Sequence, residues 1–260
     1  MRQWQSTLIS ATQRPYLCRL WVPESPAPTQ GFPLLVMLDG DWIQHHIESF
    51  VECQPRPINF AIASIGFNVA RQAARQRRSY DYTPVPPPPH APVDPRMPDW
   101  AAGGADELVQ FIRTQLLPQL QQQVSLDLNR LGLFGHSYGG LFTLYTLLTY
   151  PNLFKHYIAA SPSLWWYHPF MQNQAVHLPP LQRSTQLNVL IGDQEQWRPK
   201  PADPTAPRPA GIPTSRFLDA FMDQLPYCSQ LKTQRHSFPD ADHGAMLGLA
   251  TAFALREFAA

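Results

Sequence analysis

Residues 130–151 read RLGLFGHSYGGLFTLYTLLTYP, and this stretch decides the fold. The apolar run Leu131–Phe134 is typical of a buried strand, and Leu141–Tyr150 is typical of a helix. Between them lies Gly-His-Ser-Tyr-Gly (135–139), a G-x-S-x-G sequence in the strand–turn–helix setting of a nucleophile elbow. We therefore expect Ser137 on a tight, strained turn. The alternative is a glycine-rich turn that carries an ordinary serine.

The glycines around Ser137 support the first interpretation. Gly135 and Gly139 flank the serine, where a sharp strand-to-helix turn leaves little room for side chains. The turn raises the Ser137 hydroxyl above the edge of the sheet. The helix that follows points main-chain N–H groups at any negative charge that develops nearby. The sequence therefore predicts a nucleophile at this position.

Strand-like and helix-like segments alternate along the rest of the chain. Two N-terminal segments alternate in polarity as antiparallel strands do, and several later ones are continuous apolar runs, as in a sheet covered on both faces. The alternation predicts a single α/β domain over residues 1–260 with a mainly parallel sheet and helices on both faces. Together with the nucleophile elbow it gives the expectation of the α/β-hydrolase fold. We expect strands at 3–10, 16–22, 34–38, 58–67, 131–134, 156–160, 187–191 and 231–238, and helices at 42–51, 105–123, 141–150, 214–225 and 245–258.

The proline content is unusual for such a fold. The chain has 29 prolines, and they concentrate in residues 84–98 and 199–213. Both segments interrupt the strand–helix alternation. We interpret them as surface insertions close to the functional site, near 84–103 and 197–213. The alternative is that both are merely tolerated loops.

Composition excludes several classes of function. A net charge of +1 gives no electrostatic basis for binding nucleic acid or an acidic membrane. Three widely spaced cysteines without a CxxC pair argue against a disulfide scaffold and a zinc site, so we expect no metal and no cofactor. The longest aliphatic run, Leu34–Leu38, is too short to span a bilayer.

The sequence also gives an expectation for location. No apolar segment follows Arg2, so we expect no signal peptide and, by default, a cytoplasmic protein. A periplasmic location is expected instead if an export segment has been trimmed from the chain.

A serine hydroxyl needs a base to take its proton, and His243 is the best candidate. It follows the last predicted strand and precedes Gly244, which matches the α/β-hydrolase order in which the histidine comes last. His236 lies inside the strand pattern, which indicates a structural role. His136 is adjacent to Ser137, so its side chain should point elsewhere and pack or form a hydrogen bond.

A third residue should orient the imidazole and stabilise its charged form. It is expected after the strand that follows the elbow unit, which indicates Asp193 or Glu195. We prefer Glu195, because the two residues between Gly192 and Glu195 let its side chain extend beyond the end of the strand. A Ser–His pair without a strong acid is the alternative.

An oxyanion hole needs two N–H donors. The first is expected from Tyr138, the residue after the nucleophile. The second is expected from the loop after strand 34–38, at the amide of Gly40 or Asp41, because Gly40 allows a close approach of the main chain. The alternative for this loop is a plain turn.

Several segments together resemble the esterase branch of the α/β-hydrolases, which includes esterase D-like enzymes and the siderophore esterases that open enterobactin and salmochelin. The resemblance extends from about Leu34 to Gly244. The elbow is general to α/β-hydrolases, whereas two of the segments, 78–84 and 161–166, favour the siderophore esterases. The segments are Leu-Asp-Gly-Asp (38–41), Arg-x-x-Asp-Tyr-Thr-Pro (78–84), Gly-Gly-Ala-Asp (103–106), Gly-His-Ser-Tyr-Gly-Gly-Leu-Phe (135–142) and Ser-Pro-Ser-Leu-Trp-Trp (161–166).

The resemblance implies roles for individual residues. It implies Ser137 as the nucleophile and His243 as the base. It also implies that Arg78 faces the site and meets an anionic catecholate, and that Trp165 and Trp166 form a wall that stacks on aromatic rings. For the two tryptophans the alternative is ordinary core packing.

The function implied is hydrolysis of carboxylic esters by a serine enzyme. The implied substrate is a catecholate siderophore, a trilactone of the enterobactin or salmochelin type, free or as its ferric complex. Its ester bonds are cleaved to release iron. The alternatives are a short-chain acyl-ester or thioester hydrolase of the esterase D type, acyl transfer to an acceptor other than water, and an inactive binding protein on the same fold.

Overall fold

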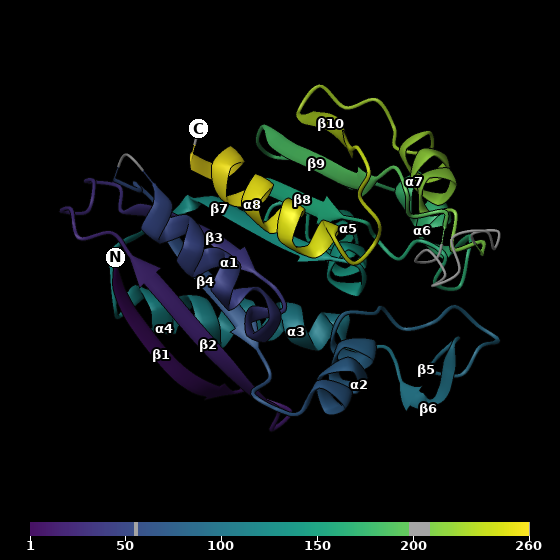
Figure 1. Cartoon of the computed structure of the whole chain (residues 1–260), viewed down its shortest axis with the longest axis horizontal. Coiled ribbons are helices and arrows are strands. Elements are labelled where there is room, and N and C mark those ends of the chain that lie inside the picture. Colours follow the sequence, from purple (N-terminus) through teal and green to yellow (C-terminus); the bar gives the residue numbers. More distant parts are fainter. Residues whose placement is uncertain (55–56, 198–208, 260) are drawn as a thin grey trace.

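The computed structural model describes residues 1–54, 57–197 and 209–259. Within them, eight strands form one sheet in the order β1-β2-β4-β3-β7-β8-β9-β10 (Figure 1). A separate pair of strands, β5 and β6, forms a hairpin. The strands are β1 (Arg2–Ile9), β2 (Pro15–Val22), β3 (Phe32–Met37), β4 (Ala61–Gly66), β5 (Val93–Asp94), β6 (Met97–Ala101), β7 (Leu126–His136), β8 (His156–Ala160), β9 (Thr185–Gly192) and β10 (Leu231–Phe238).

The sheet is mainly parallel, as predicted. β1 pairs antiparallel with β2, and β2 pairs antiparallel with β4. All other neighbours in the large sheet are parallel. The carboxyl ends of the parallel strands therefore meet at one edge, where α/β proteins place their sites.

Helices cover both faces of the sheet, which confirms the predicted layers. In Figure 1, α1 and α8 lie in front of the sheet, and α3, α4 and α5 lie behind it. α3 continues through a π-helical turn, η1, into α4. The bounds are α1 (Gly40–Cys53), α2 (Arg71–Asp81), α3 (Ala105–Phe111), η1 (Ile112–Leu116), α4 (Leu117–Gln121), α5 (Tyr138–Thr149), α6 (Phe170–Ala175), α7 (Thr214–Met222) and α8 (Met246–Ala259).

Strand β3 shows why its sequence is a continuous apolar run. Leu34 and Val36 belong to the core cluster that includes α5, whereas Leu35 and Met37 belong to the cluster that includes α1 and α8. All four side chains are fully buried. A strand covered on both faces has no solvent-facing position, so alternation is lost.

Three elements were not predicted from the sequence. Helix α2 is rich in Arg and Gln, and its buried positions include Arg78, Ser79 and Asp81, so few apolar residues mark its buried face. The hairpin β5–β6 lies inside the first proline-rich insertion, and α6 is a single short helix after β8. Of the second insertion, residues 198–208 lie outside the described residues, and Trp197 forms an isolated bridge with Ala210.

None of the described helices combines the length and apolar character that crossing a bilayer requires.

Candidate active site

Ser137 lies on the turn that joins β7 to α5. Its φ is 61° and its ψ is −115°, a left-handed conformation that is costly for a residue with a side chain. Its N–H donates to the carbonyl of Ala160, 2.9 Å away, which fixes the turn against β8. A Cβ at position 135 would overlap the main chain of Gly139, so Gly135 is required there. Gly139 itself has room for a Cβ, so the expectation that both flanking glycines are sterically required holds only for Gly135.

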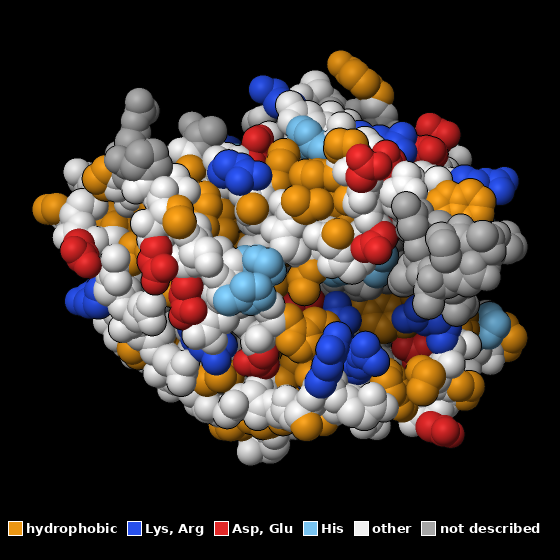
Figure 2. Space-filling view, viewed as in Figure 1, with side chains coloured by type: hydrophobic (Ala, Val, Ile, Leu, Met, Phe, Trp, Pro, Cys, Tyr) orange, Lys and Arg blue, Asp and Glu red, His pale blue; other side chains and the backbone are white. Residues whose placement is uncertain are grey.

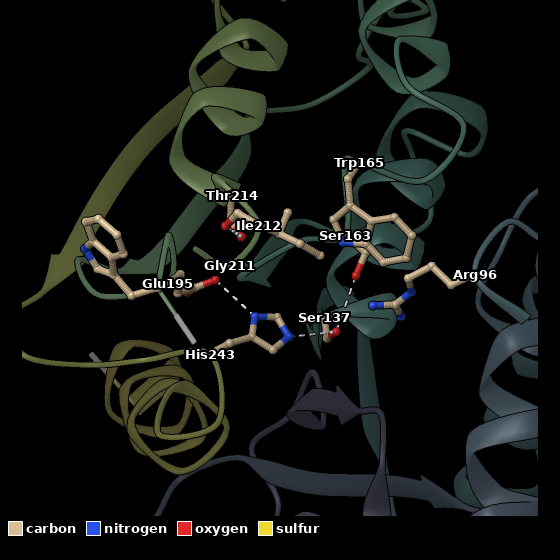
Figure 3. A pocket seen from close by; sticks show the side chains of 10 residues that line it. Arg96, Ser137, Ser163, Trp165, Glu195, Gly211, Ile212, Thr214 and His243 are labelled. Carbon is tan, nitrogen blue, oxygen red and sulfur yellow. Dashed lines mark hydrogen bonds and ion pairs between the residues drawn. The ribbon is translucent and has the colours of Figure 1, made fainter. Parts of the chain in front are cut away.

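Three side chains from different loops form a hydrogen-bonded line at this turn. The Oγ of Ser137 lies 3.0 Å from Nε2 of His243, and Nδ1 of His243 lies 3.0 Å from Oε2 of Glu195. Figure 3 shows the three side chains pointing toward one another. A hydroxyl, an imidazole and a carboxylate in this order form the arrangement of a Ser–His–acid triad.

Glu195 is held as an anion although it is buried. Its exposed fraction is 4%. Burial alone would raise the pKa of Glu195, but the hydrogen bonds with His243, with Ser161 Oγ at 2.5 Å and with the amide of Gly192 at 2.9 Å lower it overall. Asp193, the other candidate acid, is exposed to solvent. The preference for Glu195 over Asp193 therefore agrees with the geometry.

Two serines after β8 belong to the same site, and sequence reasoning gave them no role. Ser161 donates to Glu195, and Ser163 Oγ lies 3.3 Å from Ser137 Oγ. The N–H of Ser163 also donates to the carbonyl of Ser137, at 3.1 Å. The sequence could have indicated them, because both serines directly follow a buried strand and therefore lie at the carboxyl edge of the sheet.

His136 packs against the site rather than joining the triad, as predicted. Its ring is 4.8 Å from the ring of His243, and its Nε2 is 3.0 Å from the carbonyl oxygen of His243. Burial, together with the neighbouring His243 and Arg78, holds the pKa of His136 well below its usual value. The ring is therefore neutral, and Nε2 carries the proton that it donates to this carbonyl. His236, also expected to be structural, lies in β10 with Nε2 3.0 Å from Oδ1 of Asn188.

Arg78 was expected to meet substrate, but its charge is already paired. It is 8% exposed, and its Nε and Nη2 donate to the two carboxylate oxygens of Asp39 at 2.7 and 3.0 Å. Nη2 also donates to the carbonyl of His136 at 3.1 Å. Arg78 lines one cavity at the site, yet its guanidinium ties α2 to the ends of β3 and β7 rather than offering a free charge.

The predicted oxyanion donors lie at the starts of two helices. Tyr138 begins α5, and Gly40 begins α1 with Asp41 next, so their amides are among the first-turn N–H groups that lack an intrahelical acceptor. The carboxylate of Asp41 accepts hydrogen bonds from the amides of Phe67 and Asn68, at 2.5 and 2.9 Å. Neither Gly40 nor Asp41 lines the cavities at Ser137, so the second donor stays a prediction.

Two cavities meet at Ser137 and His243. The first, of about 450 Å³, has two tryptophans and Ile212 beside polar residues in its wall, and the second, of about 470 Å³, is bordered by three arginines. Figure 2 shows basic side chains over α2 and near the β5–β6 hairpin, around a hollow with apolar walls. The first is lined by Arg96, Ser137, Ser163, Trp165, Glu195, Trp197, Gly211, Ile212, Thr214 and His243, and the second by Arg75, Arg78, Asp94, Arg96, Met97, Trp100, Ser137, Tyr138 and His243.

The two tryptophans of the Ser-Pro-Ser-Leu-Trp-Trp segment have different surroundings. Trp165 lines the first cavity, as predicted. Trp166 has an exposed fraction of 0% and packs edge-on against Tyr167 and Phe170, so the prediction that it contacts substrate is wrong. Adjacent residues of this turn point in different directions, which the sequence did not indicate. Trp197, which sequence reasoning missed, lines the first cavity instead.

The family can now be assigned. The family model described as "Putative esterase" matches residues 9–204, most of the chain. The chain belongs to this esterase family. The predicted resemblance to this branch of the α/β-hydrolases is therefore confirmed.

Relatives of this chain include two proteins named for siderophores. It is 32% identical to the ferri-bacillibactin esterase BesA of Bacillus subtilis over 185 residues, 67% of this chain and 64% of that protein. It is 31% identical to the apo-salmochelin esterase of Escherichia coli O6:H1 over 182 residues, 68% of this chain and 57% of that protein. The chain thus spans less than two thirds of the length of these curated relatives.

One solved structure is similar over nearly the whole chain. The complex of the enterobactin hydrolase IroE with DFP has a TM-score of 0.73 and 25% identity, and the match covers 99% of this chain and 95% of IroE. The predicted α/β-hydrolase fold is confirmed by this match together with the mainly parallel sheet.

Proposed function

We propose that this esterase is a serine carboxylic-ester hydrolase that cleaves the ester bonds of a siderophore. The observation that carries the proposal is the line of contacts from Ser137 Oγ through His243 to Glu195, with 3.0 Å at each step. These distances are within hydrogen-bond reach, which proton transfer between a nucleophile and its base requires.

The geometry supports a two-step mechanism. His243 Nε2 takes the proton of Ser137 as its Oγ attacks the ester carbonyl carbon, and the Tyr138 amide donates to the oxyanion. The carbon–oxygen bond to the alcohol then breaks, and the alcohol leaves with the proton held by His243. Water next attacks the acyl-enzyme with His243 again as the base, which releases the carboxylic acid and restores Ser137. Glu195, held ionised by its hydrogen bonds, orients the imidazole and stabilises its charged form.

The shape of the site and the relatives support the substrate class. An ester has an acyl half and an alcohol half, and Ser137 lies where the two cavities meet, so each half has a cavity beside it. The relatives are named for bacillibactin and salmochelin, and IroE for enterobactin. IroE is described in complex with DFP, an organophosphate that reacts with activated serines. A siderophore ester, of the catecholate trilactone type, is therefore the substrate we propose.

Replacing Ser137 with alanine tests the proposal. We expect Ser137→Ala to lower kcat by at least about 10³-fold on any ester that the wild type cleaves, because the nucleophile is removed. Thermal unfolding should be little changed. Ser6→Ala, on β1 at the far edge of the sheet, is the control and should keep full activity. Wild-type turnover by Ser137→Ala would refute the mechanism.

A substrate screen separates the proposal from its alternatives. Ferric and iron-free catecholate siderophores, short p-nitrophenyl esters and thioesters are compared by kcat/KM, with product masses to show which bond is cut. A preference for the short esters or thioesters would favour the esterase D-type alternative. Failure of Ser137 to react with a fluorophosphonate probe would favour a binding protein without activity.

A further inference from the structure

The turn of the β5–β6 hairpin places an arginine beside the proposed nucleophile. Arg96 lies between β5 and β6, and both cavities that meet at Ser137 are lined by it. In Figure 3 its guanidinium points toward Ser137, with Trp165 above. This cation comes from the first proline-rich insertion, which sequence reasoning placed near the site without assigning it a role.

The hairpin is fixed to the nucleophile elbow by a buried carboxylate. Asp94, 1% exposed, accepts hydrogen bonds from Tyr138 Oη at 2.5 Å and from Ser79 Oγ at 3.0 Å. Its other oxygen accepts from the amide of Arg96 at 2.8 Å. Because Tyr138 follows Ser137 directly, the position of Arg96 is set relative to the reacting hydroxyl.

The guanidinium of Arg96 stacks on two aromatic rings and forms no ion pair with a described carboxylate. Its central carbon lies 3.9 Å from the ring centre of Trp165 and 5.5 Å from that of Tyr138. Its one side-chain hydrogen bond to a described residue goes to Tyr138 Oη, at 3.3 Å. Within residues 1–54, 57–197 and 209–259, no carboxylate forms an ion pair with it. A stacked guanidinium still presents N–H donors in its plane, in the geometry that paired oxygens accept.

We propose that Arg96 determines substrate specificity by binding a planar anionic aromatic group, an aryl carboxylate or a catecholate, that the ester carries. The paired oxygens of the anion accept from the guanidinium edge. The attached ring packs beside Trp165 in the first cavity, where Trp197 adds a second aromatic wall. The proposal rests on the proposed function and assigns the recognition of the anion to Arg96 rather than to the paired Arg78.

Matched esters test this assignment. 3-Carboxyphenyl acetate carries the anion, and 3-carbamoylphenyl acetate is its neutral counterpart of similar shape. We expect Arg96→Gln to lower kcat/KM for the carboxylate at least about 10-fold, mainly through KM, since a hydrogen bond to a charged group is lost. The carbamoyl ester should change less than about 3-fold. Arg96→Lys should keep part of the preference, because it keeps the charge without the planar fork.

A control variant and one direct binding measurement complete the test. Arg113→Gln removes a cation from an unrelated cavity beside Tyr150 and should leave the preference unchanged. Quenching of tryptophan fluorescence by 2,3-dihydroxybenzoate measures anion binding without turnover, and Arg96→Gln should weaken it at least about 10-fold.

The outcomes are distinct. Equal losses on both esters, or unchanged binding of 2,3-dihydroxybenzoate by Arg96→Gln, overturn the role of Arg96. If the wild type cleaves neither ester and resists fluorophosphonate but binds the anion through Arg96, then the proposed function fails and the anion site stands.

Discussion

Two arginines lie beside the same serine, and they differ in what their charges already contact. Arg78 is buried and holds both carboxylate oxygens of Asp39 and the carbonyl of His136. Arg96 is exposed, lies over Trp165, and forms no ion pair with a described carboxylate. A buried charge must be paired within the fold, because leaving it unpaired costs several kcal/mol. An exposed charge stays hydrated and pays no such penalty, so it needs no partner within the fold, and this is why the anion site is proposed at Arg96.

The largest expected effect is on the free energy of unfolding, which should depend strongly on Arg78 and little on Arg96. Arg78→Met leaves the carboxylate of Asp39 buried without its partner, so we expect the free energy of unfolding to fall by about 3–5 kcal/mol. Urea denaturation followed by circular dichroism measures this. The double variant Arg78→Met with Asp39→Leu should recover part of the loss, since both charges are then gone. A loss below about 1 kcal/mol for Arg78→Met would mean that the ion pair of Arg78 with Asp39 does not stabilise the fold.

An intermediate effect is expected where the hairpin joins the elbow. Tyr138→Phe removes the phenol that donates to the buried carboxylate of Asp94, so we expect a loss of about 1.5–3 kcal/mol. Amide hydrogen exchange in residues 93–101 should become faster. Tyr145→Phe is the control, because its hydroxyl bonds to Asp106 in an exposed setting and should matter less. Unchanged exchange in the hairpin would show that this contact does not anchor it.

The smallest expected effect sharpens the contrast. Arg96→Gln should change the free energy of unfolding by no more than about 0.5 kcal/mol, because the side chain is exposed and forms no ion pair with a described residue. The same urea titration measures it beside Arg78→Met. A loss comparable to that of Arg78→Met would make Arg96 a structural residue and remove the basis of the comparison.

Most of the fold and the three residues Ser137, His243 and Glu195 could be predicted from the sequence. The strands at 156–160 and 231–238 match their predicted bounds at both ends. Ser161-Pro162 follows the first strand and Pro239 follows the second, and these turn residues mark the strand ends even though most residues of 231–238 are polar. Ser137 and His243 are more than a hundred residues apart in the sequence. They could be paired because the α/β-hydrolase order places the histidine after the last strand. Glu195 could be preferred over Asp193 only because it lies further along the loop after β9.

The remainder depends on packing that a pattern of residue types does not encode. Trp165 and Trp166 are adjacent and identical in type, yet one lines a cavity and the other is in the core. Arg78 lies in a distinctive motif, but whether its charge is free depends on Asp39, which is 39 positions away. Arg96 lies in an insertion whose hairpin is short and exposed, so no pattern of alternating apolar residues predicted the hairpin or the position of Arg96.

The β5–β6 hairpin forms no ladder with the eight-stranded sheet. Its residues 93–101 are attached to the rest of the protein through side chains instead: Asp94 accepts from Ser79 and Tyr138, and the carbonyls of Val93 and Ala101 accept from Tyr167 and Ser79. If Arg96 recognises the anion as proposed, grafting a different turn between β5 and β6 should change the ligand preference while Ser137 and His243 stay in place. Selectivity can then evolve without a change in the chemistry.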